Sequence, residues 1–232
     1  MQRPVGAGIQ TILSTSATLT GVSSAATTGD LTPVIRDAIL SGEFAPSQRL
    51  IEADLSERYG ASRATVRLAL LNLANEGLVE RLPNRGARVR AITVEEAIEI
   101  VEVRIGLEAL CARKAATSLA DEDEAALREL RDALLGAVSS GNLVDYARLN
   151  QELDARIRDL SGHVTATQIL ERLRAQSARH QFRLAFHPGR AQDSAPEHVA
   201  IIDAILARDP DAAERATRAH LEGVVRLLRT LD

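Results

Sequence analysis

Several residue types that build structure or chemistry are scarce in this chain of 232 residues. Aromatic residues make up only 2%, and there is a single cysteine, Cys111, so no disulfide framework can form within the chain. The apolar helical pattern around Cys111 favours a structural thiol over a reactive one. No apolar run is long enough to cross a bilayer. We therefore expect a cytoplasmic protein.

The first 30 residues are rich in Ser, Thr, Ala and Gly and carry almost no charge, which predicts a flexible N-terminal extension over residues 1–30. Polar residues interrupt the one apolar stretch there, near residues 9–13, so we expect no secretion signal. The composition of the whole chain, 45% hydrophobic, is sufficient for packed cores in one or two domains.

Residues 51–79 have the pattern of two helices joined by a tight turn. Apolar residues recur at helical spacing before and after Gly60, Ser62 can cap the second helix, and Gly77 ends it. The pattern predicts a helix-turn-helix. Thr32 followed by proline predicts the cap of an earlier helix that packs under this pair, and Phe44 is expected in the core.

The second of these helices has a basic face. Arg63 and Arg67 are four residues apart, and guanidinium groups suit guanine edges and phosphates. Beyond it, extended runs at 78–81 and 87–90 flank a turn that carries Arg85, which predicts a wing. Residues 61–90 contain six arginines and two glutamates, whereas the whole chain has a net charge of −4. This predicts a surface that meets a polyanion, the alternative being a solvated charged helix.

The sequence after Arg90 is helical almost to its end. A capping box at Thr93 to Glu96 begins it, and turn residues divide it into about six helices without strands. We therefore predict a mainly α fold, with a winged helix-turn-helix at 31–91 and an all-helical domain for effector binding and dimerisation at 92–232. The expected helices span 94–119, 122–139, 142–160, 164–186, 195–207 and 210–231.

The run from Leu31 to Val89 resembles the winged helix-turn-helix of the GntR family of bacterial transcription regulators. The matching segments, in order, are AILSGEFAP, RLIEADLSERYGASRATVR, LANEGLV and PNRGARV. Ala64 departs from the SRTPVR pattern of many members. The resemblance implies DNA contacts from the recognition helix and the wing, made by Ser62, Arg63, Thr65, Arg67, Asn84, Arg85 and Gly86.

The helical domain resembles, on fewer residues, the FCD effector-binding domain of one GntR subfamily. The matches lie at 104–108, 150–162, 197–198 and 218–220. The resemblance implies a divalent metal (Zn, Ni or Mn) and a small carboxylate effector. The implied ligands are Asn150, Asp154, His198 and His220, with Asp154 where a histidine is usual.

Alternatives to this metal site stay open. The two histidines could be ordinary polar residues on helix surfaces, and Asp154 could pair with Arg158. Arg104 is expected either to clamp an effector carboxylate in the pocket or to pair with Glu108. The other histidines and the remaining arginine run are expected to face solvent or cap helices, with one arginine lining an anion pocket as the alternative: His163, His180, His187, Arg172, Arg174, Arg179 and Arg183.

Together these features predict a transcription regulator that binds an inverted-repeat operator as a homodimer and responds to a small metabolite. Repression is the commoner behaviour in the family that the chain resembles. No Ser/His/Asp or Cys/His arrangement and no phosphate-binding loop is present, so we expect no enzyme. The alternatives are a metal-dependent helical enzyme tethered to DNA and an architectural DNA binder with a silent bundle.

Overall fold

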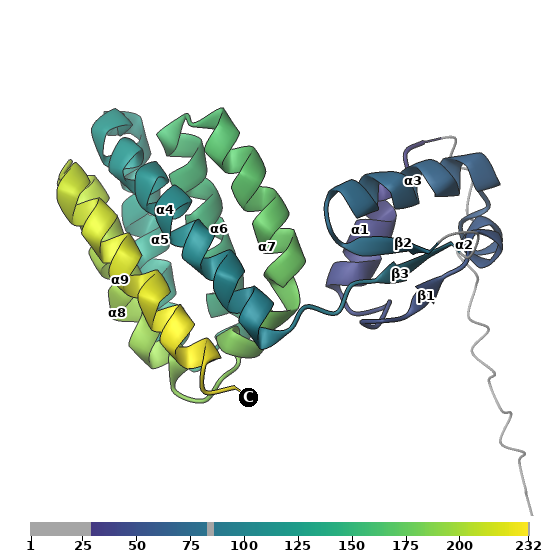
Figure 1. Cartoon of the computed structure of the whole chain (residues 1–232). Helices are drawn as coiled ribbons and strands as arrows, with labels where there is room; N and C mark the ends of the chain where they lie inside the picture. Colours follow the sequence, from purple (N-terminus) through teal and green to yellow (C-terminus); the bar gives the residue numbers. More distant parts are fainter. Residues whose placement is uncertain (1–28, 83–85, 232) are drawn as a thin grey trace, which may run out of the picture.

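The chain folds into an N-terminal winged-helix part and a C-terminal helical bundle, connected by a short extended segment (Figure 1). The structure, a computed structural model, describes residues 29–82 and 86–231. The predicted extension at 1–30 therefore lies almost entirely outside the described residues. Within those ranges, none of the helices has the length and apolarity needed to cross a membrane. The predicted mainly α fold is confirmed.

In the described ranges, the N-terminal part has three helices and a small antiparallel sheet. Its buried side chains include Ile35, Val66 and Leu73, which are fully enclosed between the helices and the sheet. Phe44 is also buried in this core, as expected. The elements are α1 (Thr32–Leu40), β1 (Arg49–Leu50), α2 (Glu52–Tyr59), α3 (Arg63–Asn75), β2 (Val79–Leu82) and β3 (Gly86–Val89), with strand order β1-β3-β2.

Local chemistry sets the ends of the helix-turn-helix. Gly60 follows α2 in the left-handed conformation, with φ of 59°, and the hydroxyl of Ser62 accepts a hydrogen bond from the Thr65 backbone N–H at 3.1 Å. Both predictions are confirmed. The predicted cap at Thr32 is wrong: α1 begins at Thr32 itself, and the carboxylate of Asp30 accepts from its backbone N–H at 2.9 Å.

The wing has a third strand that the sequence did not predict. β1 has only two residues, too few for a periodic signal, and it pairs Arg49 with Arg88 and Leu50 with Ala87. Gly86 has φ of 82°, and a Cβ at this position would lie 2.4 Å from the Leu50 carbonyl oxygen. Glycine is therefore required where β1 crosses the end of the wing. The wing residues 83–85 lie outside the described residues.

Between residues 92 and 231, which the structure describes, six helices form the bundle. They are α4 (Val94–Ser118), α5 (Asp121–Ser139), α6 (Leu143–Ser161), α7 (Val164–Ala185), α8 (Arg190–Leu206) and α9 (Pro210–Leu228). Five agree with the predicted spans to within three residues. The predicted start of α8 at 195 is wrong, because Gly189 turns the chain in the left-handed conformation and α8 begins at the next residue, with Pro196 inside it.

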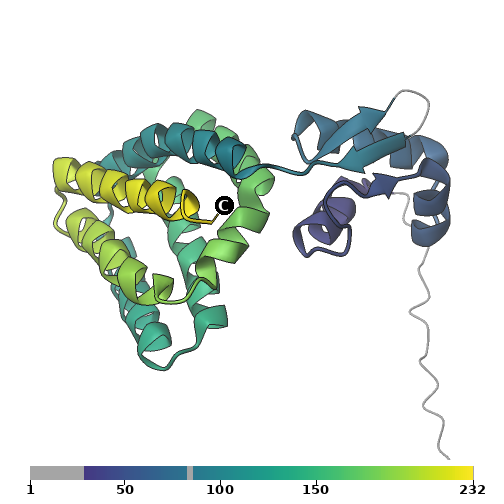
Figure 2. The ribbon, with the colours of Figure 1, turned by 60° about the horizontal axis from the view of Figure 1, so that its bottom comes forward.

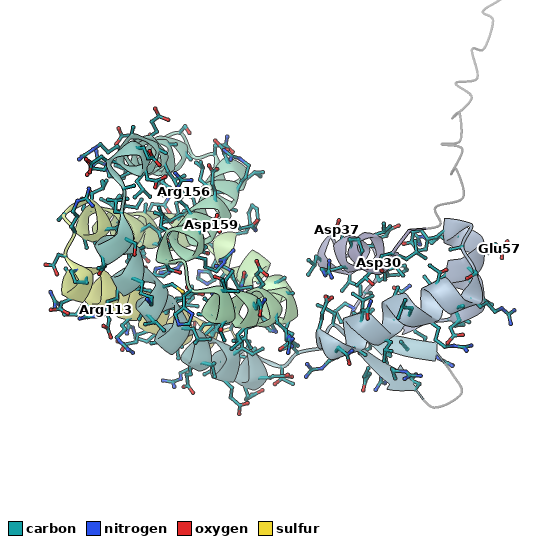
Figure 3. All side chains as sticks on the ribbon, turned by 90° about the horizontal axis from the view of Figure 1, so that it is seen from above. Asp30, Asp37, Glu57, Arg113, Arg156 and Asp159 are labelled. Atoms are coloured by element: carbon teal, nitrogen blue, oxygen red, sulfur yellow. The ribbon has the colours of Figure 1, made fainter. Side chains whose placement is uncertain are left out.

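Apolar side chains meet at the centre of the bundle, where Leu134, Leu153 and Ile202 are almost fully enclosed. Cys111 is only 1% exposed, in agreement with a structural role. Figure 2 shows α4 and α9 side by side along one edge of the bundle. Charged side chains cover the outside; Arg113, for example, pairs with Asp211 across these two helices (Figure 3).

Helix α7 of the bundle contacts the N-terminal part. In Figures 1 and 2 it is the bundle helix nearest to that part. Gln176 Nε2 donates to the carbonyl oxygen of Glu76, the C-cap of α3, at 2.8 Å. His180 Nε2 donates to the Ile92 carbonyl oxygen at 2.8 Å. The expectation that His180 faces solvent or caps a helix is therefore wrong, since its ring is buried against the connecting segment.

Candidate DNA-binding surface and ligand cavity

The predicted DNA-contacting residues of α3 lie at its N-terminal end. Ser62 and Arg63 are exposed, while Thr65 is half-buried, with its hydroxyl 2.9 Å from that of Ser62. The backbone at a helix N-terminus also favours phosphate, because its first N–H groups point outward. This end of α3 therefore offers both guanidinium groups and hydroxyls to a nucleic acid.

Arg67 is engaged in the free protein by a residue that the sequence did not single out. Its Nε and Nη2 donate to the two carboxylate oxygens of Glu52 on α2, at 3.1 and 2.8 Å. These hydrogen bonds lower the pKa of Glu52 and outweigh the opposing effect of burial. The pairing fixes the direction of the Arg67 side chain beside the N-terminal half of α3. Glu52 therefore orients the Arg67 side chain in the free protein.

A hollow borders this pair and widens the basic surface. Arg49, from the unpredicted strand β1, and Arg81, from β2, line it together with Arg63, Arg67 and Gly86. Arg49 could not be chosen from the sequence, because its position depends on the pairing of β1 with the wing. Of the other predicted wing contacts, Asn84 and Arg85 lie outside the described residues. The predicted contacts that the structure describes thus gather on one side of this domain.

A separate cavity of about 320 Å³, partly open to solvent, lies among the helices of the bundle. This volume is at the lower end of the range for small-molecule sites. Its polar lining comes from α4, α6, α7, α8 and α9, and Leu40 of α1 also reaches its wall. The lining side chains that bear on its chemistry are Arg104, Asn150, Asp154, Arg174, His198 and His220.

The four predicted metal ligands all line this cavity, but they do not all converge on one point. The rings of His198 and His220 are tilted by 51° to each other with their centroids 4.4 Å apart, and their Nε2 atoms are 3.3 Å apart. Asp154 instead forms an ion pair with Arg174 of α7, and not with Arg158 as the alternative had it. The Oδ1 atom of Asn150 is buried and has no hydrogen-bond partner among the described residues.

In this arrangement only the two histidines converge, because Asp154 is held by Arg174. Within the described residues, no group of three or more His, Cys, Asp or Glu side chains is positioned to hold a metal. The carboxylate of Asp154 is neutralised by a guanidinium, which places a positive charge beside the position that a cation would take. Metal binding by the four residues stays a prediction.

The two histidines belong to a hydrogen-bonded chain that includes three further residues. His220 Nδ1 is 2.8 Å from the carboxylate of Glu197, so this nitrogen can donate a hydrogen bond to it. His220 Nε2 can then accept from His198 Nε2, and His198 Nδ1 can accept from the Tyr146 hydroxyl at 3.0 Å. Tyr146 also bonds to Ser194. Burial lowers the pKa of His198 well below its ordinary value, and the positive charge near it adds to the effect. This matches a neutral imidazole.

Arg104 pairs with Glu108, the second of the two roles considered for it. Its Nε donates to Glu108 Oε1 at 2.8 Å, and both side chains are largely buried at the cavity wall. Burial opposes ionisation of Glu108, but the charges of Arg104 and Arg174 outweigh it and lower its pKa. Arg174, expected on a solvated face, is only 15% exposed and also lines the cavity. The helical spacing of residues within α7 could not show which of its arginines, Arg172 or Arg174, lines the cavity.

Comparisons with known proteins agree with this division into a winged helix and a helical bundle. Residues 30–89 match the family described as bacterial regulatory proteins, gntR family, and residues 99–223 match the FCD domain. The HTH-type transcriptional repressor RspR of Escherichia coli (strain K12) is 26% identical over 198 residues, covering 85% of this chain and 87% of that protein. The HTH-type transcriptional repressor GlaR of the same strain is 29% identical, covering 81% and 89%.

The fold also resembles solved structures. E. coli McbR/YncC superimposes with a TM-score of 0.72 at 22% sequence identity, covering 86% of this chain and 95% of that one. A GntR transcriptional regulator from Rhodococcus sp. RHA1 has a TM-score of 0.65 at 23% identity, covering 87% and 97%. The chain therefore belongs to the GntR family of bacterial regulatory proteins, in the group that carries an FCD domain, and it is a transcriptional regulator and not an enzyme.

Proposed function

We propose that this regulator is a repressor that binds an inverted-repeat operator as a homodimer and releases it when a small carboxylate enters the bundle cavity. The repressor names of two relatives support the sign of the response. The arginines in and around the cavity support a carboxylate, because guanidinium groups bind such anions through charge-assisted hydrogen bonds. Arg104 and Arg174 are the proposed effector contacts.

One observation carries the effector-controlled part of this proposal: α7 takes part in both sites. Arg174 and Gln181 line the cavity, while Gln176 of the same helix holds the C-cap carbonyl of the recognition helix α3. The side chain of that C-cap residue, Glu76, is in turn held by Arg36 of α1, at 2.6 and 2.7 Å. A ligand that moves α7 therefore acts directly on the helix that reads DNA.

The dimer follows from the size of the DNA-reading surface. One recognition helix and one wing cover a single half-site, and two copies related by a twofold axis match an inverted repeat. A monomer reading one half-site would have far less specificity. The predicted contacts for each half-site are Ser62, Arg63, Thr65, Arg67, Asn84, Arg85 and Gly86.

A divalent metal at the two histidines is the second candidate for effector binding. It is favoured by their Nε2 atoms, whose 3.3 Å separation is close to that of two ligands of one ion, and by the carboxylate behind His220. Such a metal would require Asp154 to leave Arg174. Metal analysis of the purified protein beside a His198→Ala/His220→Ala variant distinguishes the two candidates, because only bound metal at this site would be lost in the variant.

The proposed function is tested by selecting operators from random duplexes with the full chain. We expect two half-sites in inverted orientation and two chains per duplex by analytical ultracentrifugation. A library of small carboxylates is then screened for loss of operator binding. Selection of a single half-site bound by one chain would contradict the dimer. If no carboxylate in the library weakens operator binding, control of the regulator by a carboxylate is contradicted.

A further inference from the structure

The bundle cavity presents hydrogen-bonding atoms that the protein itself leaves unused. Arg174 Nη1, a donor, and Asn150 Oδ1, an acceptor, are both buried and have no hydrogen-bond partner among the described residues. Both side chains line the cavity. Buried polar atoms without partners are rare in folded proteins, because each has given up its water. A ligand that offers one acceptor and one donor would satisfy both.

The guanidinium of Arg174 makes a hydrogen bond through only one of its two Nη atoms. Nη2 donates to Asp154, while Nη1 is 3.9 Å from Glu108 Oε1, too far for a hydrogen bond. Burial lowers the pKa of Arg174 to about 10, so the group keeps its positive charge at neutral pH. A guanidinium fork matches a carboxylate best through two parallel hydrogen bonds. The single contact with Asp154 is therefore weaker than the contact that a free carboxylate can make.

We propose that a small 2-hydroxycarboxylate binds Arg174 in exchange for Asp154, without a metal ion, and donates its hydroxyl hydrogen to Asn150. In the ligand-free protein Asp154 stands in for the ligand carboxylate and keeps the buried guanidinium neutralised. Asn150 lies one helical turn before Asp154 on α6, so its side chain borders the same part of the cavity. The proposal rests on the proposed function in placing the effector in this cavity.

The exchange also explains how a small ligand can act on α7. The ion pair between Asp154 and Arg174 ties α6 to α7 across the cavity. Arg174 lies two residues before Gln176, which holds the end of α3. When a free carboxylate replaces Asp154, this tie between the two helices is broken while the charge of Arg174 stays neutralised. The displaced Asp154 carboxylate can then pair with Arg158, four residues further along α6, whose Nη1 is buried and has no hydrogen-bond partner among the described residues. α7 is then free to shift against α6.

The test measures anion binding directly, in the absence of DNA. The full chain is treated with EDTA, and dissociation constants for ¹³C-labelled acetate and hydroxyacetate are obtained by NMR titration. Asp154→Asn keeps the shape of the side chain but removes the competing charge. Asp159→Asn is the matched control, since Asp159 is an exposed carboxylate on the same helix (Figure 3).

We expect Asp154→Asn to bind acetate about tenfold more tightly than the wild type, because a charge-assisted hydrogen bond no longer has to be displaced. Asp159→Asn should match the wild type. Hydroxyacetate should bind more tightly than acetate, and Asn150→Leu should abolish that difference. Arg174→Lys, which keeps the charge but loses the fork, should weaken both anions.

Equal acetate affinity in the wild type and Asp154→Asn would overturn the proposal. Binding that appears only after Zn²⁺ or Mn²⁺ is restored would also overturn it. So would the failure of the wild type and all variants to bind either anion at 100-fold the concentration that saturates carboxylate-binding arginine sites in other proteins. Because operator binding is not read in this experiment, its outcome is independent of whether the regulator responds to a carboxylate on DNA.

Discussion

Replacement of Arg67 by alanine gives a sharp test of the DNA-binding surface. The Arg67 side chain is 62% exposed, and its described partner is the carboxylate of Glu52 on the neighbouring helix. The fold does not depend on such an exposed pair, so the variant should unfold at nearly the same temperature as the wild type. Its effect should be confined to DNA binding.

The expected loss follows from the type of contact. A guanidinium on a guanine edge or an essential phosphate contributes enough that its removal weakens specific binding roughly 5- to 150-fold. The unpaired carboxylate of Glu52 would add repulsion toward the DNA, so Glu52→Gln/Arg67→Ala should recover part of the loss. Arg215→Ala on α9, an exposed arginine of the bundle, changes the net charge equally and should leave binding unchanged.

The assay is a fluorescence-anisotropy titration of the selected operator at several salt concentrations. Four arginines border the hollow beside α3, and each phosphate contact contributes a slope of about 0.9 to the dependence of log affinity on log salt. We therefore expect a slope of up to roughly 3.6 per half-site, reduced by about 0.9 in Arg67→Ala if this residue contacts phosphate. A flat salt response, or full affinity in Arg67→Ala, would refute this docking surface.

Three further predictions concern the fold. Ser62→Ala removes the cap of α3 and should destabilise the winged-helix part by about 1 kcal/mol; an unchanged urea midpoint would contradict the cap's role. Gly86→Ala should destabilise it by about 1–3 kcal/mol, since a Cβ there meets the Leu50 carbonyl; an unchanged melting temperature would show that β1 is not held against the wing. Burial raises the pKa of the Cys111 thiol, so it should react with a disulfide reagent at pH 8 only as the protein unfolds; rapid labelling of native protein would contradict its burial.

The sequence was sufficient to predict the parts of the fold with local signals. Apolar spacing, the Ser62 cap and the Gly60 turn are properties of neighbouring residues, and they predicted the helix-turn-helix correctly. The strand β1 was missed because two residues carry no period, and its pairing with the wing is a tertiary contact. The start of α8 was missed because a turn signal at 187–189 does not say how soon the next helix begins.

The cavity could be predicted only in part. Family resemblance placed Asn150, Asp154, His198 and His220 in one region, and all four line the cavity. The partner of Asp154, however, comes from another helix, 20 residues along the chain. Periodicity within α7 gave no reason to separate Arg174 from the other arginines of that helix. The network through Tyr146 and Glu197 was missed for the same reason, since it joins three helices.

If ligand binding in the cavity reaches the recognition helix through α7, the Gln176 side chain is the contact that transmits it. The measurement is the operator dissociation constant with and without the carboxylate that releases the wild type most strongly. It is made for the wild type, Gln176→Ala and Gln168→Ala, a glutamine exposed on the same helix. We predict that the ligand weakens operator binding in the wild type and Gln168→Ala but changes it little in Gln176→Ala, which has lost its bond to Glu76. An undiminished ligand effect in Gln176→Ala would contradict coupling through α7.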